Sequence, residues 1–204
     1  MDESIFITFL RHGRSGGDDD GVHEGRYDAV LTEVGQQQIQ ARANGWKMVG
    51  VTFDTIIASP LQRAAYAANI VGATLDLPVE LASDWMEMDN GLEAGLTFAE
   101  AAERYPQPLT RSPYEPFSVT GESDWELHSR ALRALQGILR RGAGSYLVVA
   151  HGGIINAALR AIVGSPLAVN GHNNIWFAFG DAGYLRTMYN PNQHQWLVLE
   201  FCAE

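Results

Sequence analysis

Two histidines in this chain follow apolar segments, and each is followed by glycine. The segment IFITFLRHG ends at His12 and Gly13, and the segment YLVVAHGG contains His151 and Gly152. A neutral imidazole is a good nucleophile near pH 7, and its attack on phosphorus gives a phosphohistidine that water can resolve. Glycine lets a ligand approach the backbone and leaves N–H groups free to bind an anion. Either histidine alone could simply cap a strand, but the repeated pattern predicts a shared anion site.

Two arginines accompany these histidines. Arg11 directly precedes His12, and Arg63 lies in the segment FDTIIASPLQRAA, one turn into the helix expected there. A guanidinium can bind two phosphate oxygens at once, and it stays charged when it is desolvated. We therefore expect Arg11 and Arg63 to join the two histidines in a cationic cup within an otherwise acidic protein.

A carboxyl group is needed to protonate a leaving oxygen, and the segment DWMEMDNGLEAG offers several. Glu87 is the first candidate, because its apolar neighbours Trp85, Met86 and Met88 are expected to keep its carboxyl protonated by desolvation. Periodicity alone leaves three alternatives open in the same region: Asp84, Asp89 and Glu93.

The elements that must position these residues alternate between strand and helix. Apolar runs predict strands at 5–10, 54–58, 146–150, 175–179, 184–189 and 196–201. Helical spacing of apolar residues lies between them, for example at Ile39, Ala43 and Trp46. This alternation predicts a mainly parallel sheet with helices on both faces and a C-terminal hairpin. Ligands bind at the carboxyl ends of strands in such sheets, where His12 and His151 are expected.

Three helix starts carry capping signals. Ser59-Pro60-Leu61-Gln62 predicts a helix capped by Ser59, and Thr97 and Ser123 each stand three residues before a glutamate. We expect one domain over residues 1–204, with an excursion from the core at about 105–121. The connection 13–31 is long for a compact domain, which favours a functional role.

Composition excludes several classes of partner. The chain has 204 residues and a formal net charge of −10, which disfavours binding to nucleic acid or to an anionic membrane. The single cysteine, Cys202, cannot form an internal disulfide, and no apolar stretch reaches the roughly 18 residues that span a bilayer. We expect a soluble cytoplasmic protein without a cofactor. The oligomeric state stays open, with a homodimer as one option.

The motifs taken together resemble those of the histidine phosphatase superfamily, also called the phosphoglycerate mutase-like family. They are FLRHGRS, GRYDAVLTEVGQQQ, IIASPLQRAAYAA, MEMDNGLEAG, TGESDWELHSRA and VVAHGGIINAAL, in that order from residue 5 to about residue 159. The resemblance implies a three-layer α/β/α sandwich around a mostly parallel, mixed six-stranded sheet. It also implies that His12 is the phosphorylated histidine, that Arg11, Arg63 and His151 bind the phosphate, and that Glu87 is the proton donor.

The loops that surround the pocket depart from the family pattern. An acidic triplet, Asp18-Asp19-Asp20, follows the first histidine motif, and it should repel phosphate unless it points outward or pairs with Arg14 and Arg26. The segment after Glu87 lacks the longer, arginine-rich stretch of the cofactor-dependent mutases, which favours a phosphatase. Further substrate contacts are predicted at Ser15, His23, Tyr27, Glu122 and Asn173.

The leading hypothesis is a metal-independent phosphomonoester hydrolase that acts on a small phosphate ester through phosphohistidine on His12. A cofactor-dependent phosphoglycerate mutase would use the same cup, and a non-catalytic module could bind a phosphorylated ligand with it. A metallohydrolase is the weakest alternative, because the sequence contains no His-x-His or His-x-x-x-His pair of metal ligands.

Overall fold

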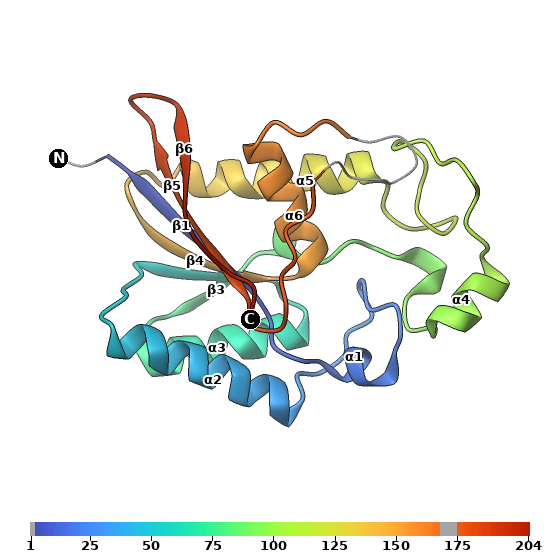
Figure 1. Ribbon diagram of the computed structural model, residues 1–204, viewed down its shortest axis with the longest axis horizontal. Coiled ribbons are helices and arrows are strands. Elements are labelled where there is room, and N and C mark those ends of the chain that lie inside the picture. The colour runs from blue at the N-terminus through green and yellow to red at the C-terminus, as the bar shows by residue number, and fades with distance from the viewer. Residues whose placement is uncertain (1–2, 168–174) are drawn as a thin grey trace.

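Six strands form one mixed sheet in the computed structural model, which describes residues 3–167 and 175–204 (Figure 1). The strands are β1 (Ile5–Arg11), β2 (Thr55–Ala58), β3 (Val79–Leu81), β4 (Gly144–Ala150), β5 (Tyr184–Asn190) and β6 (Gln195–Cys202). Their order across the sheet is β3-β2-β4-β1-β5-β6. The first four in that order are parallel, whereas β5 and β6 form an antiparallel hairpin at one side. The predicted mostly parallel, mixed six-stranded sheet is confirmed.

Helices cover both faces of the sheet. They are α1 (Gly16–Asp20), α2 (Glu33–Met48), α3 (Gln62–Leu75), α4 (Phe98–Arg104), α5 (Asp124–Leu139) and α6 (Gly152–Ile162), with two short 3-10 helices, η1 (Ser83–Trp85) and η2 (Gly91–Glu93). In Figure 1, α2 and α3 lie below the strands, and α5 and α6 lie above them. The three-layer α/β/α sandwich expected from the alternation of elements is therefore present.

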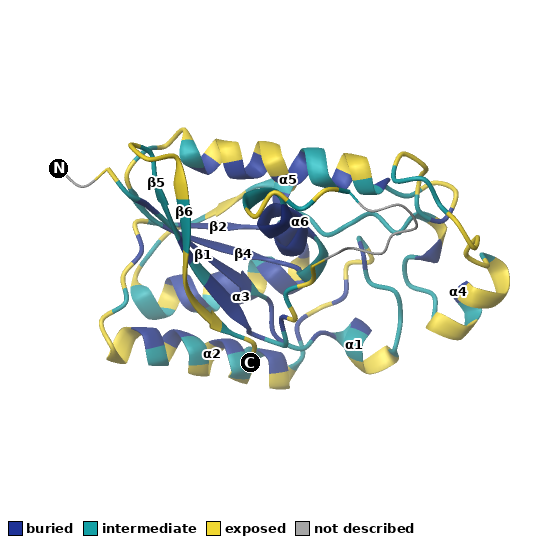
Figure 2. Cartoon of the chain, turned by 45° about the horizontal axis from the view of Figure 1, so that its top comes forward, coloured by how far each residue is buried: buried dark blue, intermediate teal, exposed yellow. Residues whose placement is uncertain are grey.

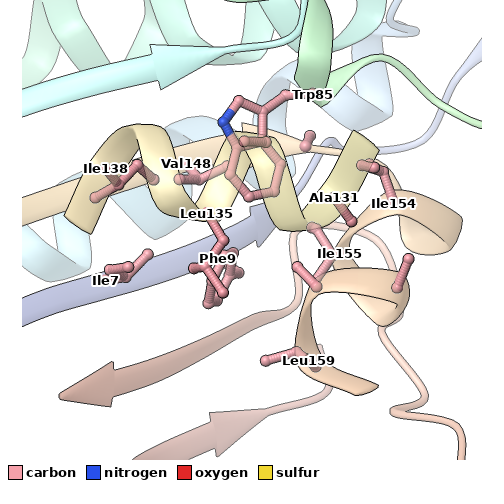
Figure 3. Close-up of a cluster of buried hydrophobic side chains, with 14 of the residues drawn as sticks. Ile7, Phe9, Trp85, Ala131, Leu135, Ile138, Val148, Ile154, Ile155 and Leu159 are labelled. Carbon is pink, nitrogen blue, oxygen red and sulfur yellow. The ribbon is translucent and has the colours of Figure 1, made fainter. Parts of the chain in front are cut away.

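Side-chain alternation along the strands builds a separate core on each face. Leu10 and Leu147 pack with α2 and α3, whereas Phe9 and Val148 pack with α5 and α6. Figure 3 shows the second core, in which Trp85 lies over the strands beside the side chains of α5. The central strands and α6 are almost wholly buried (Figure 2). Because β1 and β4 are buried on both sides, they read as continuous apolar runs in the sequence.

Some predicted elements differ from those observed. Residues 175–179 form no strand, because the side chain of Asn156 in α6 bonds both the N–H and the carbonyl of Phe177. Strand β3 was not predicted, since it has only three residues, lies at the sheet edge and is largely exposed. Helix α3 begins at Gln62 after the N-cap Leu61, so Ser59 does not cap it. The capping boxes at Thr97 and Ser123 are confirmed.

Only one of the two long irregular segments contains a helix. Residues 13–31 contain α1, which is held by a capping box between Ser15 and Asp18. Gly13 packs directly against Gly35 of α2, where a Cβ on Gly13 would lie 2.4 Å from the Gly35 carbonyl oxygen. Residues 105–121 contain neither helix nor extended strand. Among the described residues, no helix is long and apolar enough to cross a membrane.

The strand register brings the two histidine motifs together. Strands β1 and β4 are parallel neighbours, and Arg11 is paired with Ala150, so His12 and His151 leave the sheet side by side. The chain then continues from β1 toward α2 on one face and from β4 into α6 on the other. A crevice forms where connections leave a parallel sheet in opposite directions, and this is where ligands bind in open α/β folds.

Candidate active site

His12 is held in a single tautomer by the backbone that follows it. Its Nδ1 lies 2.7 Å from the Gly13 carbonyl oxygen, which can only accept a hydrogen bond, so Nδ1 carries the proton. Nε2 therefore has a free lone pair, and it accepts a hydrogen bond from Nε of Arg63 at 3.2 Å. The ring is only 2% exposed. This arrangement presents Nε2 as the nucleophilic atom.

His151 lies beside it, with the two ring centroids 5.1 Å apart. Its Nε2 is 2.8 Å from the hydroxyl oxygen of Ser59, and that oxygen also accepts a hydrogen bond from the N–H of Leu61. The Nδ1 atom of His151 is buried and has no partner among the described residues. If the Ser59 hydroxyl donates to Nε2, Nδ1 carries the proton. His151 is buried next to His12 and is not itself among the residues that line the pocket.

Both imidazoles are neutral at pH 7. Burial, followed by the charges of Arg63 and Arg11, lowers the pKa of His12 to about 3. Burial also lowers the pKa of His151 well below its usual value, again with Arg63 as the next cause. A neutral ring is the form that can attack phosphorus, because a protonated imidazole has no free lone pair.

The two arginines are both at the pocket, and both already have protein partners. Arg63 is 1% exposed, and its two terminal nitrogens donate to the carbonyls of Tyr27 and Gly25 at 2.9 and 2.8 Å. Only its Nε side is directed at His12. Arg11 donates to the Phe179 carbonyl at 3.1 Å. Arg63 therefore fixes the loop over the pocket in addition to placing a positive charge beside His12.

Glu87 lines the same pocket, but its surroundings differ from those expected. Its carboxylate accepts three backbone hydrogen bonds, from Met88 at 2.8 Å, Gly153 at 2.8 Å and Ile154 at 2.9 Å. These three contacts fix the carboxylate beside the first turn of α6. That apolar neighbours keep Glu87 protonated stays a prediction. Gly153 permits this contact, since a Cβ there would lie 2.4 Å from the Glu87 Oε1 atom.

The other predicted substrate contacts are divided between the pocket and its surroundings. His23 and Gly152 line the pocket, and His23 also lies 3.6 Å from buried Glu93. Ser15 is fully buried beneath the pocket as the cap of α1. The Tyr27 side chain is not among the lining residues, and Glu122 is instead paired with Arg130 at 2.6 Å. Asn173, with its neighbours His172 and Asn174, lies outside the described residues.

The acidic triplet has no single orientation. Asp18 lines the pocket and lies 3.5 Å from Arg11, whereas Asp19 turns away and forms an ion pair with Arg14. Arg26 pairs with Asp89 rather than with the triplet. The expected pairing with Arg14 is thus observed for Asp19, whereas Asp18 places a negative charge in the pocket.

Several lining residues were not predicted. The pocket has a volume of about 540 Å³, and segments 16–27 and 89–95, which the sequence favoured as pocket walls, contribute Val22, Glu24, Gly25 and Asn90. The lining residues outside those segments that were not named as site residues are Met88, Phe98, Gly153, Asn156, Trp176, Phe177 and Phe179. Glu24 lies directly after His23, so the loop that contributes His23 also contributes a carboxylate. Asn156 lies one helical turn after Gly152, on the face of α6 that points to the pocket. Trp176, Phe177 and Phe179 come from the segment 175–179, which was predicted as a strand but forms none.

The fold and the site together define an α/β protein with a pocket at the carboxyl edge of its sheet, lined by histidines and arginines among other residues. The chain matches the profile of the histidine phosphatase superfamily (branch 1) over residues 7–193, and it belongs to that superfamily. Among the described residues, no group of three or more His, Cys, Asp or Glu side chains is arranged to hold a metal ion.

Curated relatives share this region of sequence. "Bifunctional protein Rv2228c" of Mycobacterium tuberculosis is 36% identical over 158 residues, which are 76% of this chain and 43% of that protein. The chain thus spans less than half the length of this relative. "Uncharacterized phosphatase PhoE" of Bacillus subtilis is 31% identical over 159 residues, which are 78% of this chain and 77% of that protein.

Solved structures share the fold. A putative alpha-ribazole-5'-P phosphatase from Escherichia coli superposes with a TM-score of 0.82 at 21% identity, covering 97% of this chain and 96% of that one. A mycobacterial glucosyl-3-phosphoglycerate phosphatase, in a complex with VO3, gives a TM-score of 0.80 at 22% identity, covering 98% and 99%.

Proposed function

We propose that this chain is a metal-independent phosphomonoester hydrolase that acts through a phosphohistidine on His12. The observation that carries this proposal is the locked tautomer of His12. Its protonated Nδ1 is tied to the Gly13 carbonyl, and its unprotonated Nε2 faces the pocket beside Arg63 and His151. Membership of the histidine phosphatase superfamily supports the same reaction class.

In the first step, Nε2 of His12 attacks phosphorus, so that a P–N bond forms as the ester P–O bond breaks. Arg11, Arg63 and the Nδ1–H of His151 bind the phosphoryl oxygens and stabilise the charge that develops on them. Gly152 begins α6, and its N–H lies at the helix N-terminus, where the helix dipole favours an anion, whereas the N–H groups of Gly153 and Ile154 already donate to Glu87. These groups supply the positive charge that a metal ion would otherwise bring.

Glu87 is the group that moves protons in this scheme. Three backbone N–H groups position its carboxyl group, and the proton for the leaving oxygen comes from the monoanion of the ester and passes through Glu87. In the second step, Glu87 takes a proton from water as the water attacks phosphorus, and the P–N bond breaks. The products are the alcohol and inorganic phosphate.

The His12→Ala variant tests the proposal. We expect it to abolish release of phosphate from 4-nitrophenyl phosphate, whereas wild type remains active in excess chelator. His128→Ala in α5 is the matched control, because it removes a histidine that does not line the pocket. Rapid quench without acid should trap labelled phosphate on wild type only. Near-normal turnover by the His12→Ala variant contradicts the proposal.

A phosphoglycerate mutase is the main alternative, and the charges around the pocket do not favour it. Phosphoglycerate carries a carboxylate beside its phosphate, and Arg11 and Arg63 are the only basic side chains, apart from histidine, that line the described part of the pocket. Measuring interconversion of 2- and 3-phosphoglycerate against release of phosphate separates the two activities. A binding module without turnover would leave no labelled phosphate on His12.

A further inference from the structure

Glu24 places a carboxyl group in the pocket. Its side chain is 14% exposed, and Oε2 lies 3.3 Å from Nε of Arg63. Oε1 accepts a hydrogen bond of 2.5 Å from the Ser15 hydroxyl. Gly17 closes the other side, where an added Cβ would lie 2.5 Å from Cγ of Glu24. The carboxylate is therefore held in one position rather than free to turn to solvent.

The arginines of the cup are both opposed by carboxylates. Glu24 pairs with Arg63, and Asp18 lies 3.5 Å from Arg11. With Glu87, three carboxyl groups and only two arginines line the described part of the pocket. The undescribed residues 1–2 and 168–174 contain no lysine or arginine. A bound phosphate ester adds further negative charge, so any second anionic group on the alcohol would find no lysine or unpaired arginine in the described part of the pocket.

The wall around the leaving group is apolar and aromatic rather than basic. Its residues include Val22, Met88, Phe98, Trp176 and Phe177. Aromatic faces attract ammonium groups, and this attraction strengthens when water is excluded. An alkyl chain that ends in an ammonium group would therefore meet both apolar surface and the negative field of the carboxylates.

Burial raises the pKa of Glu24, and the charge of Arg63 and the Ser15 hydroxyl oppose that shift, so the charge of Glu24 is tested at alkaline pH. We propose that Glu24 is a specificity-determining residue that selects phosphate monoesters whose alcohol carries no second negative charge, with a cationic alcohol preferred over a neutral one. This rests on the phosphatase activity proposed above. At separations of several ångströms within a partly buried site, one unit charge changes the binding of another by about tenfold or more. Asp18 contributes to the same field, so removing Glu24 alone reduces the selectivity without abolishing it.

Three esters of similar size test the proposal at pH 8: 2-aminoethyl phosphate (cationic), propyl phosphate (neutral) and phosphoglycolate (anionic). Wild type should show kcat/KM in that order. In the Glu24→Gln variant, the ratio of kcat/KM for 2-aminoethyl phosphate to that for phosphoglycolate should fall about tenfold, mainly through KM. Comparing each variant with wild type cancels the intrinsic reactivity of the esters.

Asp19→Asn is the matched control. It removes a carboxylate from the same helix, but this carboxylate is half exposed and paired with Arg14, so the ratio should not change. Direct binding of inorganic phosphate, measured by calorimetry, gives a second measurement that needs no turnover, and Glu24→Gln should bind phosphate more tightly because Arg63 loses its carboxylate partner.

An unchanged ratio in Glu24→Gln, or an equal change in Asp19→Asn, overturns the inference. A wild-type preference for phosphoglycolate overturns it even if Glu24→Gln does not fold. These outcomes are separate from failure of the phosphatase itself. If His12→Ala hydrolyses the same esters, the proposed function fails. If His12→Ala is inactive and the ratio in Glu24→Gln is unchanged, only the role of Glu24 is refuted.

Discussion

Glu87→Gln should destabilise the folded chain as well as slow turnover, because the Glu87 carboxylate caps α6 from outside the helix. Gly153 and Ile154, whose N–H groups it accepts at 2.8 and 2.9 Å, belong to the first turn, where backbone donors have no partner inside the helix. The N–H of Met88 is the third donor, at 2.8 Å.

The expected magnitude follows from these contacts. Glutamine has one acceptor oxygen, and its NH2 group would face backbone donors, so at least one bond to a charged acceptor is lost, at about 1.5–3 kcal/mol. Loss of the negative charge at the N-terminus of the helix adds about 0.3–1 kcal/mol. Because Glu87 is partly exposed, we expect a total decrease of about 2 kcal/mol in the free energy of unfolding.

Urea denaturation at pH 7 measures this decrease as a lower midpoint with an unchanged slope. Asp84→Asn is the control, because Asp84 forms an exposed ion pair with Arg133 at 3.7 Å, and its loss should cost under about 0.5 kcal/mol. If Glu87→Gln loses activity at an unchanged midpoint, Glu87 serves only proton transfer, and its role as a cap of α6 is refuted.

Two further predictions concern the backbone and the pair of histidines. Gly13→Ala should lower the free energy of unfolding by about 2–3 kcal/mol, because its Cβ would meet the Gly35 carbonyl. Gly45→Ala is the control, because Gly45 lies on α2 with open space around it, and this change should be neutral or stabilising. Thermal unfolding compares the two variants. Folding lowers the pKa of His12 and His151 from 6.5, so below about pH 6.5 the unfolded chain binds more protons, and stability falls as the pH decreases. The free energy of unfolding falls by at most about 1.4 kcal/mol per pH unit for each histidine. In urea titrations, His12→Asn should show a shallower decrease in this free energy between pH 7 and pH 5. A decrease as steep as that of wild type would show that His12 does not contribute.

Local sequence signals were sufficient for much of the fold. Strands β1 and β4 are buried on both faces, so their apolar runs are unambiguous, and the capping boxes at Thr97 and Ser123 depend only on residues three positions apart. The same reasoning failed at residues 175–179, where the apolar composition is that of a strand but Asn156 binds the backbone instead. No signal within that segment reports a partner from α6.

The sequence by itself determined which residue types are available for phosphate chemistry and that His12 and His151 follow buried strands. Only the tertiary structure decided their electrostatic state. The charged groups around them are positioned by distant parts of the chain: Gly153 and Ile154 donate to the Glu87 carboxyl group across more than 60 residues, and Glu24 reaches Arg63 from a loop. A charge acts through space over several ångströms, so its effect depends on folded distances rather than on separation along the chain.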